Sequence, residues 1–377
     1  MKSPLIMIVG VGNLAGYILN TLVQFPETSN LVLASRNEES LQQKANLALF
    51  TASQFEHYPE IDCVPIDLEQ IQQTAATIAR IKPDLILNCS TMQSWREIAK
   101  LPKQAYTQLD RAQYGPWLPM PLTLNYQLMQ AVKLTGLDIK VLNAAFPDGV
   151  NPVLGKVGLA PTMGVGNITN IIPVLRKSIA FFLEQPMQKI QVTFLAEHYL
   201  TYSIPRFGKS GDAPFYLKAT VDGEDVSDRL DIPQVFHLVS TRFRREVGVE
   251  GAHRITTASV AKTLLAMVRD TGESMHVPGP SGLPGGYPVT VNAQGATIAL
   301  PKDLTLSEAI RINSECQQWN GIEKIDADGT VHFTEREMAV MNEVLGYHCK
   351  TMKVEECAER AKELRIKYTE FAQKYQD

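Results

Sequence analysis

The residues best suited to chemistry lie near the start of the chain, where three glycines follow a short apolar run. The run Leu5–Val9 is typical of a buried parallel strand. The glycines after it form a G-x-G-x-x-x-G sequence at Gly10, Gly12 and Gly16. A helical pattern then continues to Pro26, where proline prevents another turn. This order of strand, glycine turn and helix is typical of a segment that binds a dinucleotide.

Each part of this segment has an expected role in phosphate binding. Gly10 permits a tight turn, and Gly12 lets the backbone approach a pyrophosphate without an intervening Cβ. Gly16 is expected to let the helix pack closely on the strand. The first turn of the helix, with Asn13 and Leu14, offers unpaired N–H groups and a partial positive charge to the phosphates. A glycine turn with a purely structural role is the alternative.

The end of the second expected strand, Leu31–Ala34, favours NADP as the cofactor, with NAD as the alternative. NAD sites usually place an acid at this point to bind the ribose 2′-hydroxyl, whereas this chain reads Ser35-Arg36-Asn37. A hydroxyl and a guanidinium suit a 2′-phosphate, because arginine forms paired hydrogen bonds with phosphate oxygens and stacks on adenine. A solvated Arg36 at the strand end is the other interpretation.

Strands and helices continue to alternate as far as residue 143. Helices are expected at residues 38–57, 68–81 and 121–135, and strands at 62–66, 84–89 and 139–143. This repetition predicts an α/β fold with a doubly wound parallel sheet of the Rossmann type. Ligands bind such sheets beyond the carboxyl ends of the strands, so Asp67, Cys89 and Ser90 are expected at the cofactor site. An exposed Asp67 and a small buried Cys89 are the alternatives.

After residue 143, strands and helices no longer alternate regularly. Residues 92–121 are rich in aromatic and basic side chains, which favours a lid or substrate loop, and residues 144–152 predict a turn-rich exit from the fifth strand. From there, helices and short strands without regular alternation predict an α+β second domain. We expect a dinucleotide-binding domain at residues 1–148, a substrate and dimerisation domain at 149–333, and a helical extension at 334–377 that packs on the body or on a second subunit.

Composition narrows the class of protein. The 377 residues carry a net charge of -4, which gives no reason to expect nucleic acid as a partner. Five cysteines without a C-x-x-C spacing favour reduced thiols in a cytoplasmic protein and no metal site. No apolar run approaches the roughly 18 residues of a membrane span, and we expect no signal peptide and no membrane partner. A small-molecule substrate and a homo-oligomer are expected.

The order of the elements resembles that of the lactate/malate dehydrogenase superfamily over about residues 5 to 325. The run Ile8–Gly12 matches that family's first strand and glycine turn. Residues 155–167 are similar to the stretch before its active-site helix, and residues 196–205 resemble the segment that carries its catalytic histidine. The order of these motifs is more informative than any one of them.

The resemblance implies an oxidoreductase that moves hydride between the nicotinamide and the carbonyl or hydroxyl group of a substrate similar to a 2-hydroxy acid. His198 would be the acid/base, because imidazole titrates near neutral pH. Asn143, at the end of the fifth strand, would lie near the nicotinamide or the substrate oxygen. The alternative for His198 is a structural role at the end of a strand.

The chain departs from this family where its active-site helix supplies an Asp that orients the histidine and an Arg that binds the substrate carboxylate. Residues 167–173 contain neither an acid nor a base, and the first cation is Arg176. Without that carboxylate, the imidazolium loses an electrostatic partner, which argues against a small 2-hydroxy acid as the substrate. Other arginines are candidates for an anion site, and the sequence does not distinguish among Arg96, Arg111, Arg206 and Arg254.

Two other interpretations remain open. The sequence Ala34-Ser35-Arg36 and the pair Asn88-Cys89 also resemble the saccharopine dehydrogenase-like oxidoreductases, which implies a substrate that is an amine or an imine. The other possibility is a non-catalytic nucleotide-sensing protein, in which His198 and Asn143 lie far from the nicotinamide.

Overall fold

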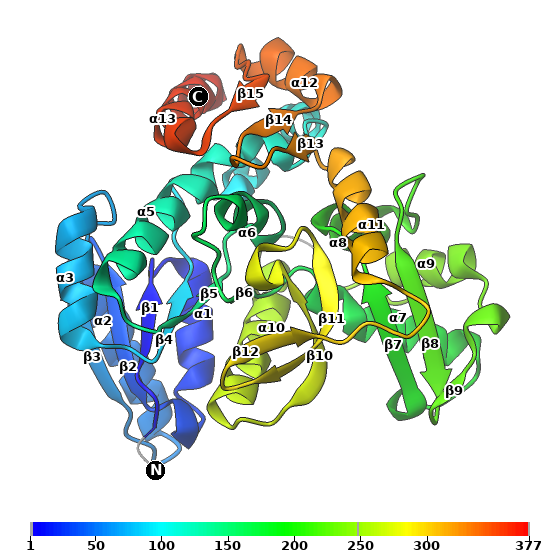
Figure 1. The fold of residues 1–377 in the computed structure, drawn as a ribbon, viewed down its shortest axis with the longest axis horizontal. Helices are drawn as coiled ribbons and strands as arrows, with labels where there is room; N and C mark the ends of the chain where they lie inside the picture. Colours follow the sequence, from blue (N-terminus) through cyan, green and yellow to red (C-terminus); the bar gives the residue numbers. More distant parts are fainter. Residues whose placement is uncertain (1–2, 247–248, 376–377) are drawn as a thin grey trace.

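A computed structural model describes residues 3–246 and 249–375. Residues 1–2 of the predicted dinucleotide-binding domain and residues 376–377 of the predicted helical extension lie outside the described residues. The first half of the chain forms a six-stranded parallel sheet in the order β3-β2-β1-β4-β5-β6 (Figure 1). Its strands are β1 (Ile6–Val9), β2 (Asn30–Ser35), β3 (Glu60–Pro65), β4 (Leu85–Asn88), β5 (Lys140–Asn143) and β6 (Met163–Gly164). Its helices are α1 (Asn13–Leu22), α2 (Glu38–Ser53), α3 (Ile71–Ile81), α5 (Pro119–Thr135) and α6 (Pro147–Lys156). The predicted doubly wound sheet is confirmed.

Both faces of this sheet are buried, which explains the uninterrupted apolar run at the start of the chain. Met7 and Val9 belong to a core that also contains side chains of α3, α5 and α6. Ile6 and Ile8 point to the opposite face and join a core with α1, α2 and α10 (Val249–Val268). Because successive side chains of a strand alternate between faces, a strand covered on both sides has no polar positions.

The prediction of a turn over residues 144–152 is wrong, because α6 begins at Pro147. Proline suits the first position of a helix, where its missing N–H would have no partner. Pro152, inside the helix, cannot donate to the carbonyl oxygen of Asp148, and the Nε2 group of Gln317 donates to that oxygen instead, at 3.2 Å. A contact with a distant segment therefore allows a helix where the local sequence favours a break.

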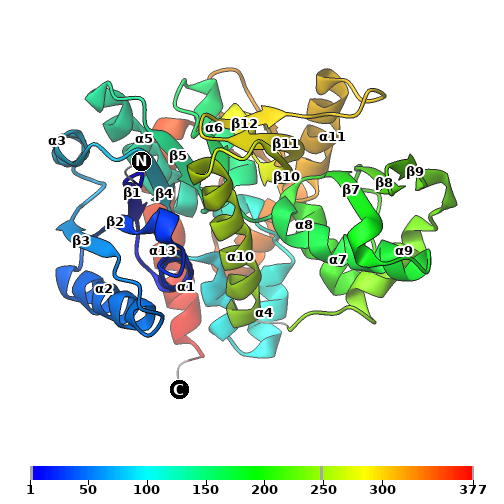
Figure 2. The same ribbon diagram turned by 90° about the horizontal axis from the view of Figure 1, so that it is seen from below.

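The second part of the chain contains antiparallel sheets and helices, as predicted. One sheet has β7 (Ile190–Leu195), β8 (Tyr216–Val221) and β9 (Glu224–Asp225); another has β10 (Glu273–Pro278), β11 (Gly286–Asn292) and β12 (Gly295–Ile298). The helices here are α7 (Ile168–Phe182), α8 (His198–Phe207), α9 (Ile232–Ser240), α10 and α11 (Leu306–Gln318). Helix α10 packs on α1 and joins the two parts of the molecule (Figure 2).

The segment at residues 92–121 and the surroundings of His198 differ from the sequence-based prediction. Residues 92–121 are not an open loop, because they include α4 (Lys103–Asp110) and short 3-10 helices at 95–100 and 115–117. Helix α4 packs against α12 (Glu335–Leu345). His198 is not at a strand end, because β7 stops at Leu195 and the Glu197 carboxylate caps the new helix α8 by accepting a hydrogen bond from the Tyr199 amide at 2.7 Å.

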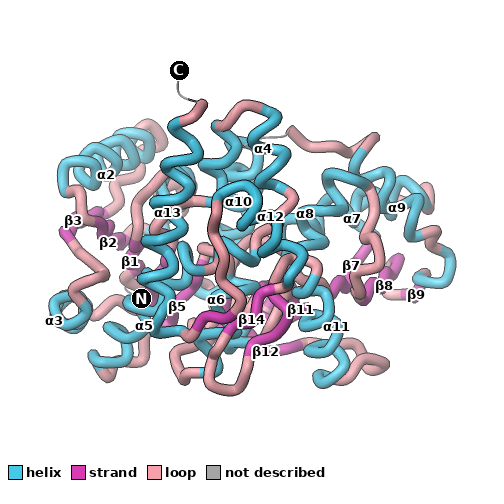
Figure 3. The backbone as a smooth tube through the Cα atoms, turned by 90° about the horizontal axis from the view of Figure 1, so that it is seen from above, coloured by secondary structure: helices cyan, strands magenta, loops and turns pink. Residues whose placement is uncertain are grey.

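The C-terminal segment packs on the first part of the chain. The apolar stripe of α13 (Cys357–Gln373) is buried, and the helix lies against α5 (Figure 3). A small antiparallel sheet joins β13 (Ile322–Ile325), β14 (Val331–Phe333) and β15 (Thr351–Met352). This sheet pairs strands from both sides of residue 334, so the segment that was expected to be helical also contributes a strand.

Candidate functional site

The glycine turn lies at the carboxyl ends of the parallel strands and is held against the end of β4. Gly10 has a φ of +81°, and a Cβ at this position would lie 2.6 Å from the Cα and the backbone nitrogen of Ser90. Its amide donates to the Ala34 carbonyl oxygen at 2.9 Å, which joins the turn to β2. Gly10 is therefore required both by its backbone conformation and by its close neighbours.

The space beside the turn fits a dinucleotide phosphate. A Cβ at Gly12 would meet no atom of the described residues within 4 Å. No side chain caps the first turn of α1, where Asn13 and Leu14 lie, and this turn contains no acidic residue. Uncapped helix amides with open space in front of them are a favourable site for an anion.

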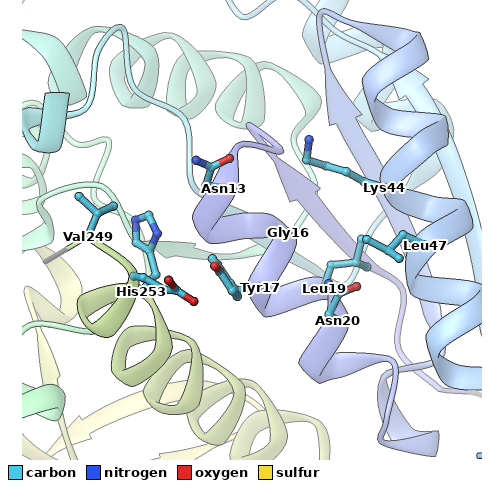
Figure 4. Close-up of a pocket in the computed structure, with 10 residues that line it drawn as sticks. Asn13, Gly16, Tyr17, Leu19, Asn20, Lys44, Leu47, Val249 and His253 are labelled. Carbon is cyan, nitrogen blue, oxygen red and sulfur yellow. The ribbon is translucent and has the colours of Figure 1, made fainter. Parts of the chain in front are cut away.

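Gly16 does not have the packing role that the sequence suggested. A Cβ at Gly16 would meet only the Lys44 side chain, at 3.8 Å, whereas the neighbouring Ala15 is the residue buried in the core. Gly16 and Asn13 instead line a groove of about 530 Å³ between α1, α2 and α10 (Figure 4). The other residues that line it are Tyr17, Leu19, Asn20, Lys44, Leu47, Val249, Glu250 and His253.

The residues expected to choose the cofactor lie at the ends of β2 and β3. Ser35 ends β2, and Arg36 is exposed. The side chain of Asn37 caps α2, because its Oδ1 atom accepts a hydrogen bond from the Ser40 amide at 2.9 Å. Asp67 is half-buried and accepts a hydrogen bond from the Glu69 amide at 3.2 Å. Arg36 is thus an exposed cation at the end of β2, where it can reach a ligand.

Cys89 and Ser90 follow β4, next to the glycine turn. Burial raises the pKa of the Cys89 thiol to about 12, so it is not a thiolate at neutral pH. Ser90 donates from its hydroxyl, at 2.6 Å, and from its amide, at 3.1 Å, to the Oδ1 atom of Asn88. These bonds hold the backbone that contacts Gly10.

Asn143 ends β5 and is fully buried. Its Nδ2 group donates to the Asn151 Oδ1 atom at 2.9 Å and to the Ala145 carbonyl oxygen at 3.2 Å. Its Oδ1 atom accepts a hydrogen bond from the Ala145 amide at 2.8 Å. The structure thus uses Asn143 to shape the turn that leads into α6.

His198 contacts side chains from both the first and the second part of the chain. Its ring lies 5.0 Å from that of Tyr114, which follows α4, and 5.4 Å from that of Phe146, which follows β5. Its Nδ1 atom lies 3.3 Å from the Nδ2 atom of Asn320, which follows α11. Burial of the ring, together with the nearby positive charge of Arg96, lowers the pKa of His198 to about 4. The imidazole is therefore neutral at physiological pH.

Two buried carboxyl groups beside His198 were missed by the sequence analysis. Glu197 accepts a hydrogen bond from the Asn320 Nδ2 group at 2.9 Å, and Asp148 accepts one from Asn167. Both side chains are completely buried, and the Oδ1 atom of Asp148 has no partner among the described residues. Burial raises the pKa of each carboxyl group, and the mutual repulsion of the two charges also raises that of Glu197. The position of Asp148 just after the fifth strand was the signal that could have identified it.

The raised pKa values predict that the contribution of these two carboxyl groups to the stability of the protein falls as the pH rises. At neutral pH these two groups bind more protons in the folded state than in the unfolded chain. Their stabilisation is therefore complete below the unfolded pKa of about 4 and is lost as the pH rises through the folded pKa values. Asp148→Asn is expected to match the wild type near pH 5 and to exceed its melting temperature near pH 9. Thermal melts from about pH 5 to about pH 9 would measure this, with exposed Asp228→Asn as the control. Parallel pH profiles for wild type and Asp148→Asn would contradict it.

Arg96 is distinguished from the other candidate arginines by its lack of an acidic partner. It lies in the 3-10 helix after β4 and is half-buried. Arg206 pairs with Asp110 at 3.0 Å, Arg254 with Glu250 at 2.6 Å, and Arg111 lies 4.0 Å from Glu343. Among the residues that the structure describes, no carboxylate lies within ion-pair distance of the Arg96 guanidinium. Arg96 is the candidate that could hold a substrate anion.

The described parts of the chain contain no group of three or more His, Cys, Asp or Glu side chains placed to hold a metal ion. Within the same residues, no helix combines the length and the apolar character that a membrane crossing requires.

Comparisons with known proteins concern the dinucleotide-binding segment and the fold. Residues 6–108 match the family model of the saccharopine dehydrogenase NADP binding domain. No curated protein sequence matches the chain.

Solved structures of dehydrogenases share the fold. A lactate dehydrogenase from a Medee basin deep-sea metagenome library has a TM-score of 0.56 and 13% identity, over 84% of this chain and 96% of its own. Lactate dehydrogenase from Cryptosporidium parvum, complexed with lactic acid and nicotinamide adenine dinucleotide, has a TM-score of 0.55 and 16% identity, over 84% and 98%. Malate dehydrogenase from Plasmodium falciparum, in complex with NADH, has a TM-score of 0.54 and 13% identity, over 84% and 96%. The matched domain and the shared fold support an oxidoreductase of the dehydrogenase type.

Proposed function

We propose that this protein transfers hydride between NADP(H) and the carbonyl or hydroxyl group of a small molecule that also carries an anionic group. The observation that carries this proposal is that Arg96, without an acidic partner among the described residues, lies close enough to His198 to lower its pKa. Tyr114 and Phe146, which follow β4 and β5 in the chain, also surround His198. The histidine of the second part is thus brought to the strand ends where a nicotinamide is expected.

In this proposal, the substrate's carboxylate binds Arg96 and its reacting oxygen binds His198. An arginine fork and a carboxylate form paired charge-assisted hydrogen bonds, which would fix the orientation of a 2-hydroxy acid or 2-oxo acid. Bound NADPH would supply the hydride. His198 serves the oxygen either as an acid/base, which requires the ring to gain a second proton, or as a hydrogen-bond donor in its neutral form.

The test is turnover with NADPH on a panel of 2-oxo acids and matched neutral ketones, followed by the absorbance of the cofactor. Turnover of oxo acids and not of ketones would support the proposal, provided that His198→Ala removes turnover and leaves NADPH binding intact. Nucleotide binding without turnover of any member of the panel would instead favour a sensing protein.

A substrate that is an amine or an imine is the second candidate, and the match of residues 6–108 to a saccharopine dehydrogenase domain favours it. The same panel with ammonium or a primary amine added would discriminate between the two. Reduction that requires the amine would support an imine substrate, whereas reduction of the oxo acid alone would support the first proposal.

Replacing Arg36 with Ala is expected to remove a preference for NADPH over NADH. Arg36 is exposed at the end of β2, where an acid would select NAD. Loss of charge-assisted bonds to the 2′-phosphate is expected to weaken NADPH binding by about 10- to 100-fold and to leave NADH binding unchanged. Fluorescence titrations with both nucleotides would measure this, with exposed Arg80→Ala on α3 as the control. Equal losses for both nucleotides would contradict the assignment.

Asn143 and the cofactor contacts of Asn13, Leu14, Ser35, Asp67, Cys89 and Ser90 remain predictions, as do a cytoplasmic location and a homo-oligomer.

A further inference from the structure

Asn320 has an orientation that its neighbours fix. Its side chain is buried, and its Oδ1 atom accepts a hydrogen bond from the Tyr114 amide at 3.2 Å. Only the oxygen end of an amide accepts hydrogen bonds, so the Tyr114 N–H determines which end is which. The Nδ2 group then faces the Glu197 Oε1 atom at 2.9 Å and the His198 Nδ1 atom at 3.3 Å.

This orientation determines where His198 carries its proton. The Nδ2 group of an amide has two hydrogens and no lone pair to accept with, so the Nδ1 atom of His198 must be the acceptor. A neutral imidazole has one N–H, which is therefore on Nε2. We propose that Asn320 is a positioning residue that fixes the neutral His198 ring with its proton on Nε2, so that the ring presents a hydrogen-bond donor to the reacting oxygen. This inference rests on the proposed function for the identity of that oxygen.

The surroundings of the ring favour the neutral form. Arg96, from the segment after β4, carries a positive charge that disfavours a second one on His198. The ring also faces Tyr114, whose pKa is raised to about 12 by burial and which is therefore neutral. The buried acids Glu197 and Asp148 have pKa values raised by burial, so they do not present two full negative charges to the ring. A second proton on Nδ1 would also point at the hydrogens of Asn320.

Among the described residues, no hydrogen-bond partner occupies the Nε2 atom, so this is the ring nitrogen that remains for a ligand. An N–H group can bind the lone pairs of a carbonyl or alkoxide oxygen but not an ammonium nitrogen, which has none. When hydride reaches the carbonyl carbon, the π electrons move to the oxygen, and the N–H···O bond strengthens with the charge that develops there. Water then supplies the proton that completes the alcohol. The inference therefore favours a carbonyl or alkoxide oxygen over a protonated amine at this position.

Nitrogen-15 NMR of the full chain labelled at its histidines tests this directly, without cofactor or substrate. A protonated ring nitrogen and an unprotonated one have distinct chemical shifts, and the His198 signals are those that disappear in His198→Gln. His276 provides an internal reference, because its Nε2 atom accepts the Phe194 amide at 3.1 Å and its proton must lie on Nδ1. At neutral pH the two residues are expected to show opposite tautomers. A His198 ring protonated on Nδ1, alone or on both nitrogens, would overturn the proposal.

Asn320→Asp provides a second measurement. A carboxylate accepts hydrogen bonds from both the Tyr114 amide and a His198 Nδ1–H group, so the His198 proton is expected to move to Nδ1. The midpoint of the His198 titration is also expected to rise by about 1 to 3 pH units, because an opposite charge favours the imidazolium. Exposed Asn342→Asp on α12 adds the same charge elsewhere and is expected to leave His198 unchanged.

The wild-type spectrum decides the proposal even where Asn320→Asp does not fold. A folded variant that keeps the Nε2–H form would overturn the role of Asn320. Absence of the proposed activity would not alter these spectra, and a different tautomer of His198 would not by itself exclude the activity. The two proposals can therefore be refuted separately.

Discussion

Gly10→Ala is expected to abolish NADPH binding and to lower the free energy of unfolding by roughly 3 kcal/mol or more. The φ of +81° is unfavourable for any residue with a Cβ, and that Cβ would lie 2.6 Å from two backbone atoms of Ser90. Neither cost is relieved by rotating a side chain, since both belong to the backbone. The turn must therefore shift, and with it the link between β1 and β4.

Gly12→Ala provides the matched control, because it removes a glycine from the same turn without these costs. A Cβ at Gly12 meets no described atom within 4 Å, so the melting temperature is expected to stay within about 2 °C of the wild type. The added methyl occupies the space where the pyrophosphate is expected, so NADPH affinity should fall by at least about tenfold. Thermal melts and fluorescence titrations of both variants would measure this. Normal NADPH affinity in Gly12→Ala would show that the phosphates do not approach the backbone there.

Arg96→Ala is expected to lower kcat/KM for an anionic substrate by about 100-fold or more and to leave NADPH affinity unchanged. Removing one partner of a desolvated charge pair costs about 2 to 5 kcal/mol, and this loss applies only while the substrate's anionic group is in place. Arg111→Ala is the control, since Arg111 belongs to the same segment but is exposed and lies near Glu343. A neutral ketone turned over by the wild type should lose little in Arg96→Ala.

The same variant has a second readout, in the titration of His198. The positive charge of Arg96 disfavours the imidazolium, so removing it is expected to raise the pKa of His198 toward the ordinary value of about 6.5. Burial of the ring is the larger cause of the lowered pKa, so the rise should be partial. An unchanged His198 titration together with unchanged kinetics would remove Arg96 from the site.

Several features of the fold could be predicted from the sequence because they depend on local pattern. The apolar runs of β1 and β2 show that both faces of the sheet are buried, and this holds whatever covers them. The glycine turn, the capping box of Thr305 and Glu308, and the cap of α9 at Asp231 also depend on residues within a few positions of each other. Such interactions require no knowledge of the rest of the chain.

Other local predictions failed where a distant contact outweighed the local preference. The two prolines of α6 predicted a turn, but Gln317 satisfies the carbonyl oxygen that Pro152 leaves free. Gly16 was assigned to packing on the strand, but it faces Lys44 of α2 across a groove. In both cases the partner lies outside the window that a periodic pattern covers.

Short motifs and the order of the elements were enough to predict a doubly wound sheet and to name His198 as a candidate. Only the tertiary structure assembled the surroundings of His198, because Asp148 follows β5, Glu197 caps α8, Asn320 follows α11 and Arg96 follows β4. Burial raises the pKa values of Asp148 and Glu197 and lowers that of His198. How deeply a residue is buried depends on the packing of the whole fold and not on any one segment. Apart from Glu197, which is its neighbour in the chain, these residues lie 50 to 122 positions away from His198.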